Sequence, residues 1–220
     1  VTTGASKGGI TATYHKFFFP KDVDGAIPYV APASRARVDG EYQTQLDARL
    51  PDPCAQKLRD AQVAALTTRR QMMIGKLVGQ TQAGTYPLLL EYITETIDWA
   101  FWQYYGVGYC NRVPATTASD DVFFNFFATF SGLNSGSHPA PATDPRSDSA
   151  LSYEWLTEQG FALQVNKDVA PLLQEPLAKA TMEDDFRMQN PGVELPDYNG
   201  SLTALVRRWA RNFTVDTLFI

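Results

Sequence analysis

The stretch VTTGASKGG, residues 1–9, decides how the chain around it is expected to fold. Residues 1–3 are β-prone, and apolar side chains recur at helical spacing from Ile10 to Phe18, after which Pro20 ends the pattern. Glycines permit a tight, closely packed turn between the two elements, and they stand at Gly4, Gly8 and Gly9. The stretch therefore predicts a strand, a sharp turn and a helix.

Residues 4–8 of this stretch match the pattern G-x-S-x-G. Between a strand and a helix, this pattern is typical of a serine nucleophile exposed at a strained turn. The hydroxyl of Ser6 would attack an acyl carbon, and the backbone N–H of Lys7 would donate to the developing oxyanion. The alternative is an ordinary glycine-rich turn, which can instead bind phosphate at the helix N-terminus.

A catalytic serine needs a base, and the sequence contains two histidines, His15 and His138. His15 lies nine residues past Ser6 on the predicted helix, too far along it for the ring to reach the hydroxyl. His138 lies in a Ser/Gly/Pro-rich stretch ahead of any closing strand. We expect both to be structural or surface residues, and the catalytic base to lie outside this chain.

Periodicity and turn-forming residues predict further elements along the chain. Strands are predicted at 26–31 and 215–220. Helices are predicted at 52–77, at 87–105, from Ser119 onward, at 150–159 and at 202–209. Stretches rich in Gly, Ser, Pro and Asp predict surface loops at 132–149 and 192–200.

These elements indicate an α/β fold whose sheet is incomplete and is interrupted by a large, mainly helical lid insertion. Residues 1–34 would form a piece of the core with the serine turn, 35–200 the insertion, and 201–220 a truncated return to the core. Both ends look like interior segments of a larger domain. We therefore expect this chain to be a piece of a longer protein.

Composition bears on partners and cofactors. The formal net charge is −5, and no basic cluster is longer than Arg69-Arg70 or Arg207-Arg208. The sequence therefore lacks the clustered basic residues that bind nucleic acid, and nucleic acid is not an expected partner. No apolar run approaches the roughly 20 residues that span a bilayer. No cysteine–histidine pattern indicates zinc, and no cofactor or metal is expected. The two cysteines, Cys54 and Cys110, are compatible with a disulfide or with two buried thiols.

Four runs of the sequence resemble the secreted bacterial tripeptidyl and prolyl tri/tetrapeptidyl aminopeptidases, a family of serine peptidases in the α/β-hydrolase clan. The strongest run is TGASKGGITATYHKFFFPKDVDGAIPYVAPAS at 3–34. It is followed by CAQKLRDAQVAALTTRRQMM at 54–73, by EYITETIDWAFWQYYGVGYC at 91–110 and, more weakly, by ALVRRWARNFTVDTLFI at 204–220.

The resemblance implies an incomplete α/β-hydrolase sheet, with Ser6 as the nucleophile and Lys7 as a donor to the oxyanion hole. It implies a secreted or periplasmic protein, and with it a disulfide between Cys54 and Cys110. In such enzymes the triad Asp, the His and a second oxyanion donor come from segments that this chain lacks. The remainder of the parent hydrolase domain is therefore an expected partner, together with a peptide substrate.

Two groups of residues are candidates for substrate binding. Glu91, Glu95 and Asp98 follow one another at helical spacing, and a carboxylate among them could bind the ammonium group of a substrate N-terminus; the alternative is a solvated face. An aromatic set, which includes Trp99 and Trp102, could line a pocket for proline rings; the alternative is core packing. Its other members are Tyr104, Tyr105, Phe123, Phe124 and Phe127.

The predicted function is that of a serine exopeptidase, which releases tri- or tetrapeptides from free N-termini through an acyl-enzyme on Ser6. Without the triad Asp and His, the isolated chain is expected to be inactive. Two alternatives are open. One is an α/β-hydrolase esterase with the same turn, and the other is a noncatalytic helical binding module.

Overall fold

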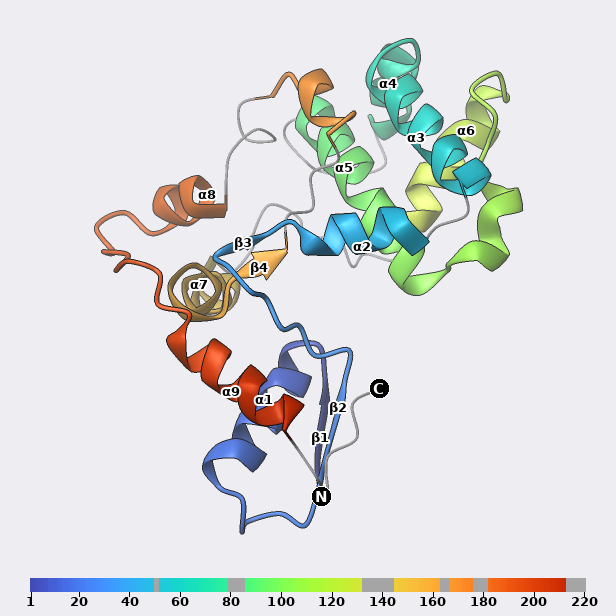
Figure 1. Ribbon diagram of the computed structural model, residues 1–220. Coiled ribbons are helices and arrows are strands. Elements are labelled where there is room, and N and C mark those ends of the chain that lie inside the picture. Colours follow the sequence, from blue (N-terminus) through green and yellow to red (C-terminus); the bar gives the residue numbers. More distant parts are fainter. Residues whose placement is uncertain (50–51, 79–85, 132–144, 163–166, 176–181, 213–220) are drawn as a thin grey trace. The chain divides into compact units, whose positions relative to one another are not determined.

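The computed structural model describes residues 1–49, 52–78, 86–131, 145–162, 167–175 and 182–212 (Figure 1). The chain divides into two compact units. The first comprises Val1–Asp39, Ser149–Ala162 and Gly192–Ile220, and the second comprises Gly40–Asp148 and Leu163–Pro191. The division expected at residues 34 and 200 stays a prediction; in these compact units, residues 35–39, 149–162 and 192–200 group with the first unit.

The described residues are mostly helical, with two pairs of short parallel strands, in agreement with the coarse α/β expectation. None of the described helices is long and apolar enough to cross a membrane. The predicted strand at 215–220 and most of the predicted loop at 132–149 lie outside the described residues.

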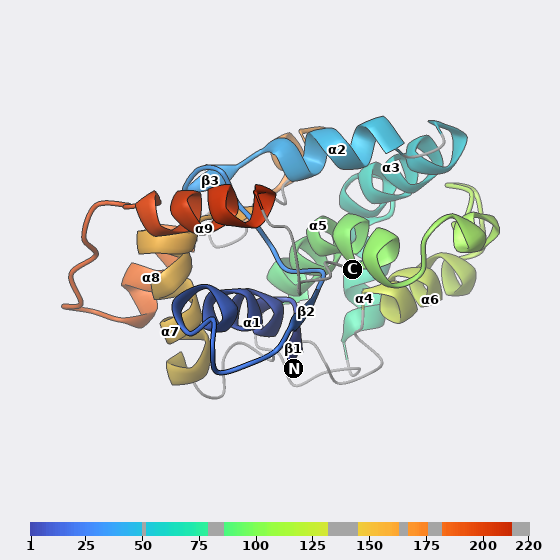
Figure 2. The ribbon, with the colours of Figure 1, turned by 60° about the horizontal axis from the view of Figure 1, so that its bottom comes forward.

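The first unit opens with the predicted strand, turn and helix (Figure 2). β1 (Thr2–Ala5) leads through the turn into α1 (Lys7–Phe18), and β2 (Ala26–Tyr29) pairs parallel with β1, which confirms these elements. The register places Thr2 opposite Ala26 and Ala5 opposite Tyr29. β2 stops short of the predicted residue 31, because Val30 adopts a φ of 43°, outside the β region.

The turn between α1 and β2 is built around a buried lysine. Lys16 is 7% exposed, and its ammonium donates to the backbone carbonyls of Pro20, Val23 and Asp24 at 3.1, 2.7 and 3.4 Å. A buried cation needs such compensation. Lys16 therefore fixes the path of the chain from the end of α1 to the start of β2.

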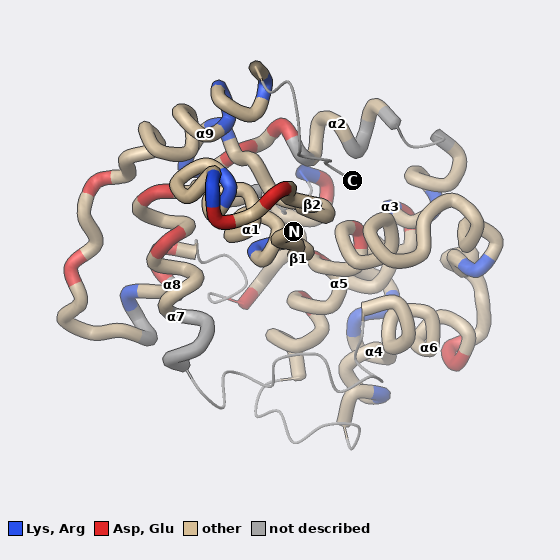
Figure 3. The backbone as a smooth tube through the Cα atoms, turned by 90° about the horizontal axis from the view of Figure 1, so that it is seen from below, with Lys and Arg blue, Asp and Glu red and all other residues tan. Residues whose placement is uncertain are grey.

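α9 (Ser201–Arg211) packs on α1, with the rings of Phe17 and Trp209 5.3 Å apart. Its last turn carries Arg208 and Arg211, where positive charge complements the helix dipole (Figure 3). This helix confirms the prediction at 202–209.

α7 (Pro145–Glu154) runs directly into a π-helix, Trp155–Gln159, so the helix predicted at 150–159 begins earlier and changes geometry midway. The π-helix ends at Gly160, which has a φ of 74°. β3 (Val38–Asp39) and β4 (Phe161–Ala162) then form the second parallel pair. The sequence did not predict this pair, because two-residue strands carry no periodicity.

The second unit is helical, and its core is one cluster of apolar side chains. The described elements are α2 (Glu41–Arg49), α3 (Asp52–Leu66), α4 (Arg70–Leu77), α5 (Tyr86–Tyr104), the 3₁₀-helix at Val107–Arg112, α6 (Asp120–Phe130), the 3₁₀-helix at Ala170–Leu172, and α8 (Met182–Gln189). α5 confirms the helix predicted at 87–105, and α6 confirms the helix predicted from Ser119 onward. The hydroxyl of Ser119 caps α6 by accepting from the amide of Val122 at 3.5 Å.

The single helix predicted at 52–77 is wrong, since a break at 67–69 separates α3 from α4. The hydroxyl of Thr67 donates back to the carbonyl of Val63, which weakens helix continuation. The guanidinium of Arg69 donates to the carbonyls of Thr116 and Ala118 and lies 4.8 Å from the ring centroid of Phe123. These contacts hold the chain where the helix breaks.

Apolar residues at helical spacing predict a buried stripe on this helix, and the buried stripe of α5 is rotated from it; the predicted stripe comprises Leu89, Ile93, Ile97, Ala100 and Tyr104. Leu90, Ile93, Ile97 and Phe101 are each 0% exposed, whereas Tyr104, which was expected on the stripe, is 66% exposed. The two stripes share Ile93 and Ile97, because both follow the same helical period.

Candidate active site

Ser6 lies at the turn between β1 and α1 with a backbone φ of 52° and ψ of −121°. A positive φ is costly for a residue with a side chain and is held only when the surroundings impose it. The amide of Ser6 donates to the carbonyl of Tyr29 at 3.0 Å, and the carbonyl of Ser6 accepts from the amides of Gly9 and Ile10. The side chain itself is exposed. The turn is thus anchored to β2 and presents the hydroxyl to solvent.

Two of the three glycines are required by close packing. A Cβ on Gly4 would collide with the backbone of Gly8, and one on Gly9 would lie 2.9 Å from the carbonyl oxygen of Tyr29 and 3.0 Å from the Cβ of Ala31. A Cβ on Gly8 would meet no described atom within 4 Å. The expectation that all three glycines serve the packing is therefore met at Gly4 and Gly9 only.

The first turn of α1 offers backbone donors beside the Ser6 hydroxyl. Among the described residues, the amides of Lys7 and Gly8 have no backbone acceptor, as is usual for the first residues of a helix. The N-terminal end of the helix dipole adds positive potential at the same place. This turn can stabilise negative charge that develops next to Ser6.

The side chain of Lys7 has a partner of its own, separate from the role of the Lys7 amide. Its ammonium forms an ion pair with the carboxylate of Glu154, the last residue of α7, and both side chains are about 40% exposed (42% and 41%). No sequence pattern signalled Glu154, because it lies 147 positions away from Lys7.

His15 lies on α1 with its Nε2 3.9 Å from the carboxylate of Asp22 and its ring against Phe19. A separation of nine residues on a helix puts it about 13 Å along the axis from Ser6. His15 therefore lies in the last turn of α1, where its contacts are structural. His138 lies outside the described residues.

Glu91 is 0% exposed and lies within the second unit. Its carboxylate pairs with the guanidinium of Arg70 and accepts from the amides of Gln174 at 2.9 and 3.0 Å and of Glu175 at 2.9 Å. The carboxylate is saturated by these partners and shielded from solvent. Glu91 therefore holds residues 174–175 against α5 and has no free oxygen for a substrate ammonium.

Glu95 and Asp98 lie on the same side of α5 as Glu91 in different surroundings. Burial, and then the neighbouring Glu91 carboxylate, raises the pKa of Glu95 to about 7. Asp98 is 6% exposed and accepts from the indole N–H of Trp102 at 2.8 Å. The solvated face that the sequence left open is thus absent, because all three carboxylates are at least partly buried.

The aromatic set divides between core and surface. Phe123, Phe124 and Phe127 are buried, and Trp102 and Tyr105 pack against the same core. Trp99 and Tyr104 are exposed, with rings 5.8 Å apart at 89°. Trp99 and Tyr104 are thus the most exposed members of the set, and Trp102 and Tyr105 are half-buried.

The two cysteines are joined in the structure. Cys54 on α3 and Cys110 in the 3₁₀-helix form a disulfide with a Cα–Cα distance of 5.5 Å. The bond ties together two segments of the helical core. No group of three or more potential metal ligands occurs among the described residues.

Comparison with known proteins places these features in a family. The model of the PS-10 peptidase S37 family matches residues 1–140, which include the serine turn. The prolyl tri/tetrapeptidyl aminopeptidase of Streptomyces mobaraensis is 33% identical over 142 residues, which cover 61% of this chain and 30% of that protein. The chain thus aligns with less than a third of its relative. No solved structure matches. Since the family match covers more than half of its residues, the chain belongs to the PS-10 peptidase S37 family.

Proposed function

We propose that this chain carries the nucleophile turn and the helical lid of a serine exopeptidase with an α/β-hydrolase core. The substrate is a peptide with a free N-terminus, from which a tri- or tetrapeptide is released, also after proline. The observation that carries the proposal is the strained backbone of Ser6, which exposes a hydroxyl between a parallel strand and a helix. Membership of a peptidase family supports it.

In this mechanism the Ser6 hydroxyl attacks the carbonyl carbon of the scissile amide. The amide of Lys7 donates to the oxyanion of the tetrahedral intermediate, aided by the N-terminus of α1. The C–N bond then breaks, the amine leaves with a proton, and water hydrolyses the resulting ester of Ser6.

The proton from Ser6 needs a base, and His15 is about 13 Å away along α1. We assign the triad Asp, the His and the second oxyanion donor to other parts of the full-length protein. The alignment with 30% of the aminopeptidase is consistent with a larger enzyme. The Cys54–Cys110 disulfide supports a secreted or periplasmic location, because such bonds persist in oxidising compartments.

Glu95 is the remaining candidate for the ammonium of the substrate N-terminus. Glu91 is saturated by Arg70 and two amides, and Asp98 is buried against Trp102. A bound ammonium would favour the ionised form of Glu95, whose pKa of about 7 lets it respond at neutral pH. Exposed Trp99 lies one turn further along α5 and is a candidate contact for the peptide.

A fluorophosphonate probe tests the nucleophile directly. The full-length protein is expected to be labelled, and Ser6→Ala is expected to abolish both labelling and turnover of a tripeptide chromogenic amide, with a loss in kcat of about 10⁴-fold or more. Labelling that survives Ser6→Ala would refute the assignment.

The same assay separates the alternatives. An esterase would turn over an ester but not the matched amide, and a noncatalytic binding module would not be labelled at all. The isolated chain is expected to give no turnover, because it lacks the proposed base. Turnover by the isolated chain at the rate of the full-length protein would contradict that expectation.

A further inference from the structure

α1 begins without the two features that usually fix the start of a helix. No side chain caps it, and its first turn contains no acidic residue. The Ser6 side chain, which stands at the cap position, makes no capping bond. A capping side chain would occupy an amide of the turn that the proposed mechanism uses for the oxyanion. The position of this turn therefore depends on other contacts.

One such contact joins the first residue of α1 to another helix. The ammonium of Lys7 pairs with the carboxylate of Glu154, and both residues belong to the first unit. The backbone amide of Lys7 is also the donor that the proposed mechanism assigns to the oxyanion. A contact that restrains the side chain of Lys7 therefore acts on the residue whose amide must be aligned.

The segment that follows Glu154 is itself attached to α9. The carbonyl of Thr157, in the π-helix, accepts from the amide of Asn199 at 2.7 Å. The carbonyl of Glu158, the next residue, accepts from the hydroxyl of Thr203 at 3.1 Å. Asn199 immediately precedes the cap position of α9, and Thr203 lies in its first turn. Glu154 thus adjoins a segment whose path is fixed by two hydrogen bonds.

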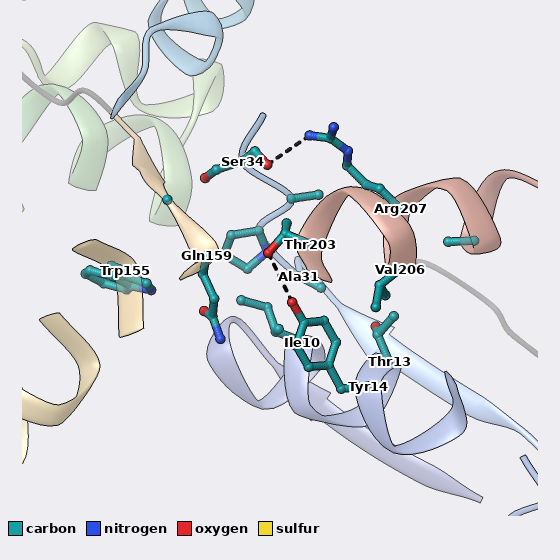
Figure 4. A pocket seen from close by; sticks show the side chains of 14 residues that line it. Ile10, Thr13, Tyr14, Ala31, Ser34, Trp155, Gln159, Thr203, Val206 and Arg207 are labelled. Atoms are coloured by element: carbon teal, nitrogen blue, oxygen red, sulfur yellow. Dashed lines mark hydrogen bonds between the residues drawn. The ribbon is translucent and has the colours of Figure 1, made fainter. Parts of the chain in front are cut away.

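α9 is attached in turn to α1 at two places. The hydroxyl of Thr203 donates to the carbonyl of Glu158, so the hydroxyl of Tyr14, 3.2 Å away, donates in their mutual bond (Figure 4). Near the end of α1, the rings of Phe17 and Trp209 lie 5.3 Å apart. A cavity of about 130 Å³ is lined by residues of α1, the π-helix and α9. The contacts therefore run from the first residue of α1 through the π-helix and α9 and back to α1.

We propose that Glu154 is a positioning residue, whose carboxylate acts through the ammonium of Lys7 to hold the first turn of α1 with the Lys7 amide aimed at the oxyanion. The proposal rests on the proposed function, because it takes Ser6 as the nucleophile. In this role Glu154 does not contact the substrate. Its effect is therefore expected on the transition state and not on substrate binding.

The exposure of the ion pair limits the size of this effect. The two side chains are 42% and 41% exposed, and solvent weakens pairs of this kind. Such a pair can change the population of an aligned conformation by up to about fivefold. A larger loss of activity would need a cause other than the pair.

The test compares variants of the full-length protein on a tripeptide chromogenic amide. Glu154→Gln keeps the size of the side chain and removes its charge, and is expected to lower kcat about three- to fivefold with KM changed less than about twofold. The rate of fluorophosphonate labelling of Ser6 should fall by the same factor, because that reaction also develops negative charge beside the Lys7 amide. Rates are calculated per labelled serine, so unfolded protein does not contribute.

Two further variants separate the charge of Glu154 from its place in the fold. Glu154→Asp keeps the carboxylate within reach of the flexible Lys7 side chain and is expected to retain at least about half of kcat and of the labelling rate. The matched control is Glu158→Gln, which removes an exposed carboxylate four residues further along the same segment. It should leave both rates unchanged.

Salt tests the same pair without a substitution. At an ionic strength of about 1 M the Debye length is about 3 Å, so an exposed pair is screened. The kcat of the wild-type protein is expected to fall toward that of Glu154→Gln. The variant reports any response to salt that does not pass through the pair, and equal responses of the two proteins would overturn the proposal.

Three kinetic results would also overturn it. These are an unchanged kcat and labelling rate in Glu154→Gln, a raised KM at unchanged kcat, and a loss of kcat that Glu154→Asp fails to restore. Failure of the proposed function gives a different result, because the wild-type protein would then escape fluorophosphonate labelling altogether. Wild-type labelling that slows in Glu154→Gln and recovers in Glu154→Asp supports the positioning role.

Discussion

The ammonium of Lys7 and the carboxylate of Glu154 form an ion pair that joins the first residue of α1 to the last residue of α7, 147 positions later. Lys7 follows the strained Ser6, and Glu154 precedes the π-helix that lines the cavity. The pair therefore links the nucleophile turn to the segment that carries Gln159.

A double-mutant cycle measures this link. Lys7→Met, Glu154→Gln and the double variant are expected to give a coupling energy of about 0.5–1 kcal/mol in urea unfolding, small because both side chains are about 40% exposed (42% and 41%). The coupling should shrink in high salt. The charge-reversed variant Lys7→Glu/Glu154→Lys is the control, because it keeps an opposite-charge pair. If the effects of the two single substitutions on the free energy of unfolding add up to that of the double variant, the contact contributes no coupling energy.

The backbone strain at Ser6 is testable by two substitutions that both remove the hydroxyl. Glycine tolerates the φ of 52°, whereas alanine does not, so Ser6→Gly is expected to be about 1 kcal/mol more stable than Ser6→Ala. Chemical unfolding of the full-length protein gives the difference. Equal stabilities would mean that the turn relaxes without cost.

The glycines of the same turn form a matched pair. Gly9→Ala brings a methyl group against Tyr29 and Ala31 and is expected to destabilise by about 1–3 kcal/mol. Gly8→Ala enters open space in a helix and should be neutral or stabilising by up to about 1 kcal/mol. Thermal unfolding of the two variants measures the difference in stability. An equal loss of stability in both would contradict the packing described for Gly9.

The buried pair Arg70–Glu91 is expected to carry a large penalty when broken. Glu91→Gln leaves the guanidinium of Arg70, only 8% exposed, without its counter-charge, which costs about 3–5 kcal/mol. The control is Glu183→Gln, which breaks an exposed pair with Arg187 on α8 and should cost no more than about 0.5 kcal/mol. Similar urea midpoints for both variants would argue against the buried network.

Glu95 makes stability depend on pH. Its pKa is about 7 in the folded state against an ordinary 4.5, so the folded protein binds more protons than the unfolded chain between these values. The stabilisation by the neutral carboxyl is full below pH 4.5 and is lost as pH rises through 7, with a slope of at most about 1.4 kcal/mol per unit. Glu95→Gln should flatten this dependence, and an unchanged slope would remove Glu95 as its source.

The serine turn could be predicted from the local sequence, because the residues that indicate it interact with neighbours only a few positions away. The β-prone residues before Gly4, the helical period from Ile10 and the stop at Pro20 agree with one another, and the structure confirms the strand and helix. The same holds for α6, where Ser119 caps the helix. Local agreement of this kind needs no knowledge of the rest of the fold.

The acidic face of α5 shows where such reasoning stops. Helical spacing predicts that Glu91, Glu95 and Asp98 lie on one face of the helix. It does not predict which of the three is buried. That depends on Arg70, 21 residues earlier, and on the amides of Gln174 and Glu175, 83 and 84 residues later. The break after α3 has the same origin, since Arg69 bonds to carbonyls 47 and 49 positions away.

The strand, the turn and the helix that expose Ser6 follow from short-range sterics and periodicity, so they could be predicted from the amino-acid sequence alone. Three other relationships depend on the tertiary structure: Lys7 pairs with Glu154, the carboxylate of Glu91 is saturated, and the buried Oε1 of Gln159 accepts from no residue that the structure describes. These relationships join residues far apart in the chain, and packing rather than local propensity brings such residues together.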